Sequence, residues 1–419
     1  MELGLREALL KDGRRLLEQL LESVDASLPN ATRQEGEKRH ADRPRHIETI
    51  FGTLHLKRDY FYSPATGESR VPLDQALGLI DSHSPGLVRL ASRAAAREGY
   101  EAASDDLKAL AGISIEGRQI QRLVNQIGPQ VAAQLKDLSP AAKKDDEPIP
   151  VFYVEVDGTG VPMVPEELVG RKGKQPDGSA KTREVKLGCA FTQTKTDEDG
   201  QPVRDFQSTT YVGSFESAEE FGAQIRAEAL RRGISRAKKF AFIGDGAAWV
   251  WELARVNFPL AILILDFFHM MEYLHTICQE LYRKESSWAQ RMKDQWREML
   301  EEDQVDEVIA AMHRRLEDLP EISAEQLDSV TKQIAYLENN RERMKYGTYR
   351  KQGLFYGSGV VEAGCKTVVG KRLKQSGMLW TRAGAESVLA LRCALMGNRW
   401  DECWDRINDS HYLKPKIAA

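Results

Sequence analysis

Hydrophobic spacing divides the chain into a mainly helical N-terminal part and a longer part in which strands and helices alternate. Leucines recur at helical spacing through the first residues and predict a helix that ends near Pro29. Residues 45–62 alternate between apolar and polar positions around Gly52, which predicts a β-hairpin. Residues 63–80 are rich in turn-forming residues.

Helical spacing resumes at Ser84, where Pro85 stands at a favourable N-terminal position. Residues 104–110 and 116–127 predict two further helices with a short break between them. This pattern is typical of a helix-turn-helix, whose second helix can enter the major groove, but a helical hairpin inside a bundle has the same pattern. The second helix offers three candidate DNA contacts: Arg118, Gln119 and Arg122.

After Pro150 the pattern becomes that of an α/β domain. Ser217 and Glu220 stand at capping-box spacing, which fixes the start of its first helix. The expected order is three strands, then helix, strand, helix, strand and helix, with strands at 151–160, 183–194, 205–213, 239–245 and 260–267. This order is that of a ribonuclease-H-like domain with a mixed sheet.

The predicted fold class is therefore α/β: a ribonuclease-H-like catalytic domain with an α-helical insertion, preceded by a mostly helical DNA-binding region with a β-hairpin. The expected segments are an N-terminal helix (1–45), the hairpin and turn-rich segment (46–80), the helix-turn-helix region (81–138), a linker (139–150), the first part of the catalytic core (151–283), the insertion (284–350) and the C-terminal helices of the core (351–419).

Composition narrows the class of protein. The chain has 419 residues, of which 42% are hydrophobic and 29% are charged, an ordinary balance for a globular protein. This balance excludes a disordered tail, a collagen-like chain and a disulfide scaffold, and the five cysteines form no CxxC pair. The longest apolar run, 259–265, is far short of the roughly 20 residues that a membrane helix needs. The opening residues predict an amphipathic helix and not a signal peptide, so we expect a cytoplasmic, nucleoid-associated protein with no membrane partner.

Charge is unevenly distributed behind a formal net charge of −4. Residues 291–330 hold 12 acidic against 5 basic residues, whereas residues 341–382 hold 10 basic against 2 acidic ones, with aromatic residues interspersed. Basic residues bind phosphate through counterion release, and aromatic rings can stack on bases. Trp380 has a second interpretation, packing against the sheet. The candidate DNA contacts in this stretch are Lys366, Lys371, Arg372, Lys374, Trp380 and Arg382.

Three carboxylates fall where this fold would bring them together. Asp157 is expected at the end of the first strand, Asp245 at the end of the fourth, and Glu362 in a helix that follows a Gly-Ser-Gly turn. In a ribonuclease-H-like sheet the first and fourth strands are neighbours. Clustered acids repel one another unless a cation neutralises them, and oxygen ligands favour Mg²⁺ or Mn²⁺. Two such ions about 3.5–4 Å apart support in-line phosphoryl transfer, and glycines such as Gly246 would let a phosphate approach.

Each acid also has a structural interpretation. Asp-Gly is a common turn, so Asp157 or Asp245 alone is more often a turn residue than a ligand. Glu155 shares a strand face with Asp157 and is a weaker supporting candidate. Asp266 and His269 form a D-x-x-H at the next strand end. They are either active-site support or a hydrogen-bonded fold residue and a core histidine.

A set of motifs resembles those of a known family. The order DGTGVP, GDGAAWVW, DFFHMMEYL, GSGVVEAGCKTVVGKRLKQSGMLWT and GAESVLALR resembles the ISKra group of bacterial insertion-sequence transposases, distant relatives of the Mutator-like DDE enzymes. The resemblance implies a catalytic triad of Asp157, Asp245 and Glu362 and maps the D/C-x-x-H element onto Asp266 and His269. Related proteins often carry a cysteine-containing zinc-ribbon-like element after the hairpin, but this chain reads RDYFYSPATGES there.

The main hypothesis is a DDE transposase that uses Mg²⁺ or Mn²⁺ to cleave double-stranded DNA at terminal inverted repeats and to join the ends to target DNA. A dimer is expected because two DNA ends must be brought together. One alternative is a domesticated DNA-binding protein or repressor without strand transfer. The other is a ribonuclease-H-like nuclease.

Overall fold

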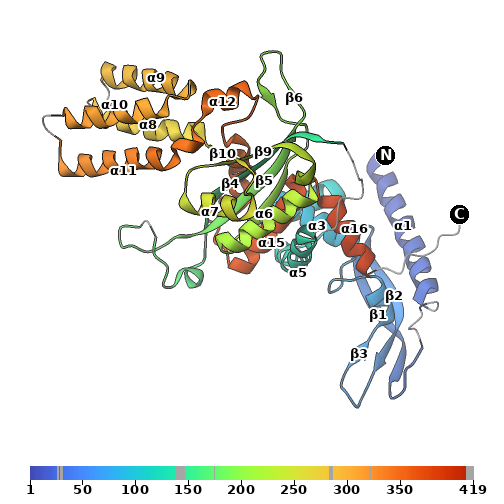
Figure 1. Cartoon of the computed structure of the whole chain (residues 1–419). Helices are drawn as coiled ribbons and strands as arrows, with labels where there is room; N and C mark the ends of the chain where they lie inside the picture. The colour runs from blue at the N-terminus through green and yellow to red at the C-terminus, as the bar shows by residue number, and fades with distance from the viewer. Residues whose placement is uncertain are drawn as a thin grey trace.

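A five-stranded mixed sheet lies at the centre of the computed structural model (Figure 1). The structure describes residues 1–25, 28, 32–137, 147–173, 175–282, 286–319 and 322–411. The strand order is β10-β9-β4-β5-β8, and β4 runs parallel to β9 but antiparallel to β5. The expected mixed sheet, with its first and fourth strands adjacent, is confirmed. The strands are β4 (Ile149–Pro162), β5 (Thr182–Gln193), β8 (Thr210–Ser214), β9 (Ala237–Gly244) and β10 (Ile262–Leu265).

Helices cover both faces of the sheet because alternate side chains of the central strand point to opposite sides. Phe152 and Val154 of β4 pack in the same cluster as Phe221 of α6 (Ala218–Arg231) and Val250 of α7 (Ala248–Asn257). The capping box that begins α6 is present as expected. The opposite face is covered by α3 (Pro85–Arg97), α5 (Gly117–Lys136), α13 (Gly359–Gly364) with its continuation, and α15 (Arg382–Met396).

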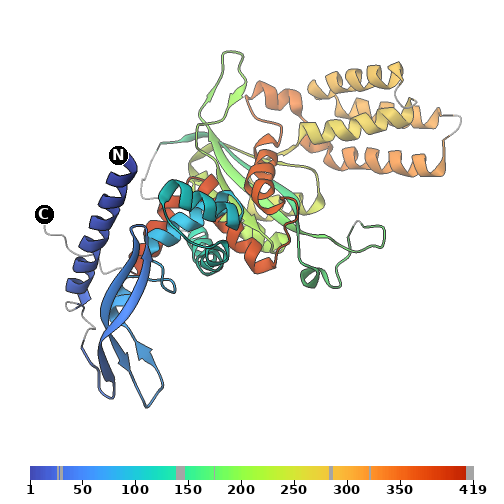
Figure 2. The same ribbon diagram turned by 180° about the vertical axis from the view of Figure 1, so that it is seen from behind.

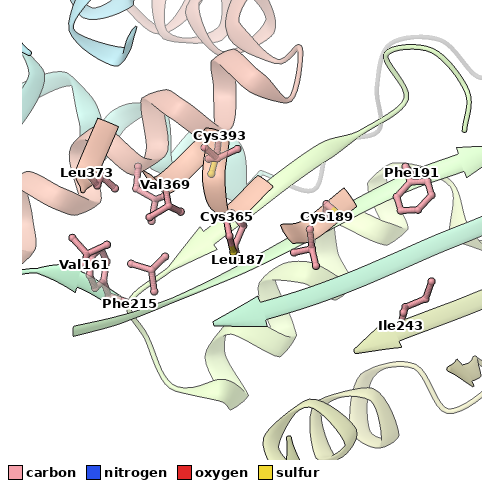
Figure 3. Packing of buried hydrophobic residues seen from close by; sticks show 14 of the residues in the cluster. Val161, Leu187, Cys189, Phe191, Phe215, Ile243, Cys365, Val369, Leu373 and Cys393 are labelled. Carbon is pink, nitrogen blue, oxygen red and sulfur yellow. The ribbon is translucent and has the colours of Figure 1, made fainter. Parts of the chain in front are cut away.

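The helix that begins with α13 continues through a π-helical turn, η5 (Cys365–Gly370), into α14 (Lys371–Leu373). Cys365, Val369 and Leu373 belong to the cluster buried against the sheet, where Cys365 lies close to Leu187 of β5 and the other two lie near Val161 and Phe215 (Figure 3). A π-turn adds a residue to one helical turn and is frequent at functional sites. Here it begins at Cys365, three residues after Glu362.

The expected helical insertion is present at one end of the molecule (Figure 1). It packs on α8 (Phe267–Leu281), and its helices share one buried cluster with the sheet. Three helices make up most of it: α9 (Ser287–Glu301), α10 (Val305–Glu317) and α11 (Ala324–Asn340). The chain then returns to the sheet through η4 (Arg341–Arg343) and α12 (Tyr346–Lys351).

The N-terminal elements lie at the other end of the molecule (Figures 1 and 2). The hairpin is formed as expected by β1 (Lys38–Thr49) and β2 (Gly52–Tyr62), and it packs with the N-terminal helix around its own small core. The remaining elements of this part are α1 (Glu2–Asp25), β3 (Ser69–Arg70) and α2 (Pro72–Ala76). Residues 138–146, most of the expected linker, lie outside the described residues.

The pair of helices expected to form a helix-turn-helix packs in the same buried cluster as the five-stranded sheet. It consists of α4 (Tyr100–Asp106), the π-helical η1 (Leu107–Ala111) and α5. One face of α5 is buried against α15, and a Cβ at Gly128 would lie 2.4 Å from that of Ser387. The last described element is α16 (Trp400–His411), which also contacts α5. The short elements are η2 (Pro165–Leu168), β6 (Lys195–Thr196), β7 (Pro202–Val203) and η3 (Ile234–Arg236).

Candidate active site

Asp157 and Asp245 lie side by side on neighbouring parallel strands. The last paired residues of β4 and β9 are Glu155 and Ile243, so that each aspartate stands two residues beyond its own member of that pair. The pKa of Asp157 is raised, first by burial and also by the nearby charge of Asp245. The two carboxylates are therefore close enough to interact.

The two aspartates occupy different positions relative to the ends of their strands. Asp245 directly follows the end of β9 at Gly244, and its Oδ1 accepts the Ala247 amide at 3.0 Å. Asp157 was expected to end its strand, and this expectation is wrong. The strand β4 continues to Pro162 because β5 remains paired with it as far as Thr182. Asp157 instead marks the place where β4 loses its other neighbour, β9.

Glu362 comes from the helix α13, which Glu155 ties to the central strand. Glu155 is fully buried, and its Oε2 accepts the Val361 amide at 2.8 Å. Burial is the main reason that the pKa of Glu155 is raised to about 8, and the charge of Asp266 also raises it. Glu362 itself has a half-exposed side chain, with its carboxylate 3.9 Å from Lys366 Nζ.

Asp266 has a structural role, because its carboxylate hydrogen-bonds two separate segments of the chain. It is 1% exposed and caps the N-terminus of α8 by accepting the amides of Phe268 and His269. It also accepts the Ser358 amide at 3.1 Å and the Ser358 hydroxyl at 2.8 Å. These four hydrogen bonds use the acceptor positions that a carboxylate has. Of its two interpretations, the structure favours the hydrogen-bonded fold residue, which locks the Gly-Ser-Gly turn in front of Glu362.

His269 lies near Asp157 and is partly exposed, unlike a core histidine. Its side chain is about one-third exposed, its Nδ1 lies 3.6 Å from Glu272, and its ring meets Tyr273 edge-on. Its charge is among the causes that lower the pKa of Asp157. The structure therefore places His269 close enough to influence Asp157.

The three carboxylates share one neighbourhood without forming a ready-made metal site. The Cys365 thiol is hydrogen-bonded to Asp157 and also interacts with the charge of Glu362, one helical turn before it. Within the residues that the structure describes, no group of three or more His, Cys, Asp and Glu side chains is placed to hold a metal ion. The oxygen donors themselves are of the type that Mg²⁺ and Mn²⁺ prefer.

Two of the expected DNA contacts, Lys374 and Lys366, lie next to residues of this site, and two others are at least partly exposed. Lys374 Nζ donates to the hydroxyl of Thr159, two residues after Asp157, which places its charge at the site. Lys366 is 79% exposed, and Lys371 is also exposed. Arg382 is partly exposed and bound to Glu216 and Glu386.

Two of the expected contacts are buried and belong to the packing. Arg372 has no exposed surface, donates from Nε to the Ala95 carbonyl at 2.7 Å, and lies between the rings of Tyr100 and Trp380. Trp380 is 7% exposed and donates from Nε1 to the Leu373 carbonyl. Both side chains fix the end of α14 against α4, so neither is available to DNA in this structure. Their expected role as DNA contacts is therefore replaced by a role in packing.

The contacts expected on α5 differ among themselves. Arg118 and Arg122 are exposed on its outer face. Gln119 completes the capping box that begins the helix, with its Oε1 accepting the Glu116 amide at 3.2 Å. A side chain engaged in its own helix cap is a weaker candidate for base contacts.

Sequence reasoning missed the residues that hold the carboxylates in place. Tyr336 donates from its hydroxyl to the Asp245 carbonyl across 91 positions of sequence, and no motif signals this contact. The Gly-Ser-Gly turn was recognised, but the hydrogen bonds of its serine to Asp266 were not. Cys365, which the sequence did not single out, is a free buried thiol, as are the other four cysteines.

Comparison with known proteins places the chain in a family. Residues 1–404 match the family described as "Uncharacterised protein family (UPF0236)", and the chain belongs to this family. One relative is the "UPF0236 protein in vanSb 3'region" of Streptococcus gallolyticus, which is 26% identical over 382 residues, 90% of this chain and 78% of that protein.

A solved structure, the Drosophila P element transposase strand transfer complex, has a TM-score of 0.29 and 9% identity, covering 80% of this chain and 83% of the other. A TM-score and a sequence identity this low support no conclusion about the function of this chain. Among the described residues, no helix combines the length and the apolar character that crossing a membrane requires.

Proposed function

We propose that this protein is a DNA transposase whose ribonuclease-H-like catalytic domain uses Asp157, Asp245 and Glu362 as a DDE triad. One observation carries the proposal: adjacent parallel strands bring Asp157 and Asp245 together beside a helix that presents Glu362. Carboxylates that are left this close repel one another, and a bound cation relieves the repulsion. A turn or a fold alone has no need for this arrangement.

In this proposal the three carboxylates would hold Mg²⁺ or Mn²⁺, because their oxygens are of the type that these ions prefer. When bound, such ions activate a water or 3′-hydroxyl and stabilise the leaving oxygen of a phosphodiester. The chain itself supplies the positioning. Asp266 and Glu155 fix α13 against the sheet, and Lys374 brings positive charge to the strand that carries Asp157.

The proposed substrate is double-stranded DNA: the terminal inverted repeats that flank the gene and a target duplex. Lys366, Lys371 and Lys374 are the proposed phosphate contacts at the site, and Arg118 and Arg122 are proposed contacts on the outer face of α5. A dimer that brings two ends together forms part of the proposal.

A cleavage assay tests the triad. Duplex DNA that carries the repeat ends is incubated with Mg²⁺ and the purified full-length protein or its variants Asp157→Asn, Asp245→Asn and Glu362→Gln. Each substitution removes one charged oxygen ligand, so we expect cleavage to fall by about 10²–10³-fold. Asp328→Asn, at an exposed aspartate of α11 that pairs with Lys332, is the matched control and should cleave like the wild type.

Two outcomes contradict the proposal in different ways. Full activity in all three variants would show that other groups carry the chemistry. A wild-type protein that binds the repeat ends tightly but cuts no strand would indicate the binding-only alternative.

A further inference from the structure

The helical insertion makes direct contact with the turn that presents Asp245. Tyr336 lies on α11, and its hydroxyl donates to the backbone carbonyl of Asp245 at 2.6 Å. Its ring stacks face to face on Tyr273 of α8, with centroids 3.9 Å apart and planes 7° from parallel. The stack fixes the direction of the Tyr336 hydroxyl, since the ring cannot tilt without separating from Tyr273.

Gly246 is shaped for this contact. Its φ is +90°, a conformation that favours glycine, and a Cβ placed there would lie 2.4 Å from the Tyr336 hydroxyl oxygen. The sequence suggested that this glycine makes room for a phosphate. In the structure, the tyrosine of the insertion fills that space.

A second residue of the same helix contacts α7, the helix that follows the turn. Asn340 lies one helical turn after Tyr336 and is 3% exposed. Its Oδ1 accepts from Trp251 Nε1 of α7 at 2.7 Å, and its Nδ2 donates to the Tyr336 carbonyl at 2.9 Å. The guanidinium of Arg343 lies over the Trp251 ring at 4.6 Å. The C-terminal part of α11 therefore contacts both the Asp245 carbonyl and the helix α7 that follows it.

We propose that Tyr336 is a positioning residue that holds the Asp245 turn in its active arrangement, so that the insertion forms part of the catalytic machinery. The other bonds that restrain the turn are the one from the Ala247 amide to Asp245 Oδ1, the backbone bonds at Gly244 and Ala247, and the strand pairing of β9. The Tyr336 hydroxyl adds a bond from the insertion to the Asp245 carbonyl itself. The inference rests on the proposed function for its catalytic meaning, whereas the restraint itself is a property of the folded protein.

Hydrogen exchange of the full-length protein, without metal or DNA, tests the restraint. Tyr336→Phe keeps the ring stack and removes only the donor. We expect the amides of 245–247 to exchange about fivefold faster than in the wild type, the effect of losing one hydrogen bond of ordinary net strength. Tyr282→Phe is the matched control, because that ring packs on Trp296 and Arg315 at the far end of α8, and it should leave this segment unchanged.

A Mg²⁺ titration of repeat-end cleavage tests the consequence. In Tyr336→Phe the half-saturating Mg²⁺ concentration should rise about fivefold, while the rate at saturating Mg²⁺ stays within about twofold of the wild type. A role in stability alone would lower the melting temperature and leave the Mg²⁺ dependence unchanged. Exchange rates and Mg²⁺ dependence both equal to the wild type would overturn the inference. A wild type that cleaves nothing would overturn the proposed function instead, and the exchange experiment would still decide whether Tyr336 restrains the turn.

Discussion

At the scale of single residues, neighbours in the sequence have opposite roles. Lys371 and Arg372 stand side by side in the basic stretch, yet the first is exposed and the second is completely buried. A helix turns by about 100° per residue, so adjacent side chains point in different directions. The sequence shows two adjacent basic residues and does not indicate which of them is exposed.

Arg372 is expected to matter for stability. Arg372→Ala removes a hydrogen bond to the Ala95 carbonyl and a cation between the rings of Tyr100 and Trp380. The free energy of unfolding should fall by about 2–4 kcal/mol. Urea denaturation measures this loss. DNA affinity per folded molecule should be unchanged, and a selective loss of DNA binding with normal stability would show that the side chain leaves its buried position.

Lys371 is expected to behave in the opposite way. Lys371→Ala should change the free energy of unfolding by no more than about 0.5 kcal/mol, because the side chain is exposed. DNA affinity should fall about uniformly across sequences, and the slope of log affinity against log salt should decrease by about one. Gel-shift titrations at several salt concentrations give both values. An unchanged salt slope would remove Lys371 from the contact surface.

At the scale of elements, two buried carboxylates hold the helix α13 at its beginning. Glu155 accepts the Val361 amide, and Asp266 accepts the Ser358 amide and hydroxyl. Amides at a helix N-terminus lack partners within the helix, and acceptors aimed at them are stabilising. These hydrogen bonds fix the position of the first turn of α13, and with it that of Glu362, relative to the sheet.

The carboxyl of Glu155 makes stability depend on pH. Its pKa is about 8 in the folded protein, above the ordinary value of 4.5, chiefly because of burial. Between these values the folded state keeps a proton that the unfolded state has lost, so its contribution is complete below pH 4.5 and is lost as pH rises towards 8. Denaturation of wild type and Glu155→Gln from pH 5 to 8.5 should show this decline only in the wild type. Parallel curves would mean that Glu155 is ionised in the folded protein.

At the scale of the whole molecule, the acidic and basic stretches occupy different places. The acidic residues of 291–330 lie on the insertion, at one end of the molecule (Figure 1). Of the basic residues of 366–382, Lys374 lies at the strand that carries Asp157, as its bond to Thr159 shows, and Lys366 lies beside Glu362. The formal net charge of −4 averages over both.

This separation predicts a steep salt dependence of DNA binding. If the protein neutralises several phosphates with these basic residues, log affinity should fall linearly with log salt with a slope of about −0.9 per phosphate neutralised. A titration of the wild type between low and moderate salt measures it. A flat response would exclude these basic residues as the contact surface.

Much of the architecture follows from local signals. The strand signal at 151–160 and the capping box of Ser217 are properties of a few adjacent residues, and they predicted the central strand and the start of α6. Strand ends were less predictable, as Asp157 shows. Whether β4 continues depends on its partner β5, and hydrogen bonding between strands is not a property of either strand alone.

The sequence by itself determined the elements, their order and the three carboxylates, because periodicity, capping and turn chemistry act over short distances. Only the tertiary structure decided which side chains support those carboxylates. Tyr336 reaches Asp245 across 91 residues, and Arg372 is buried while Lys371 is not. Such contacts depend on how helices pack on the sheet, and that packing is a sum of many long-range contacts with no local pattern.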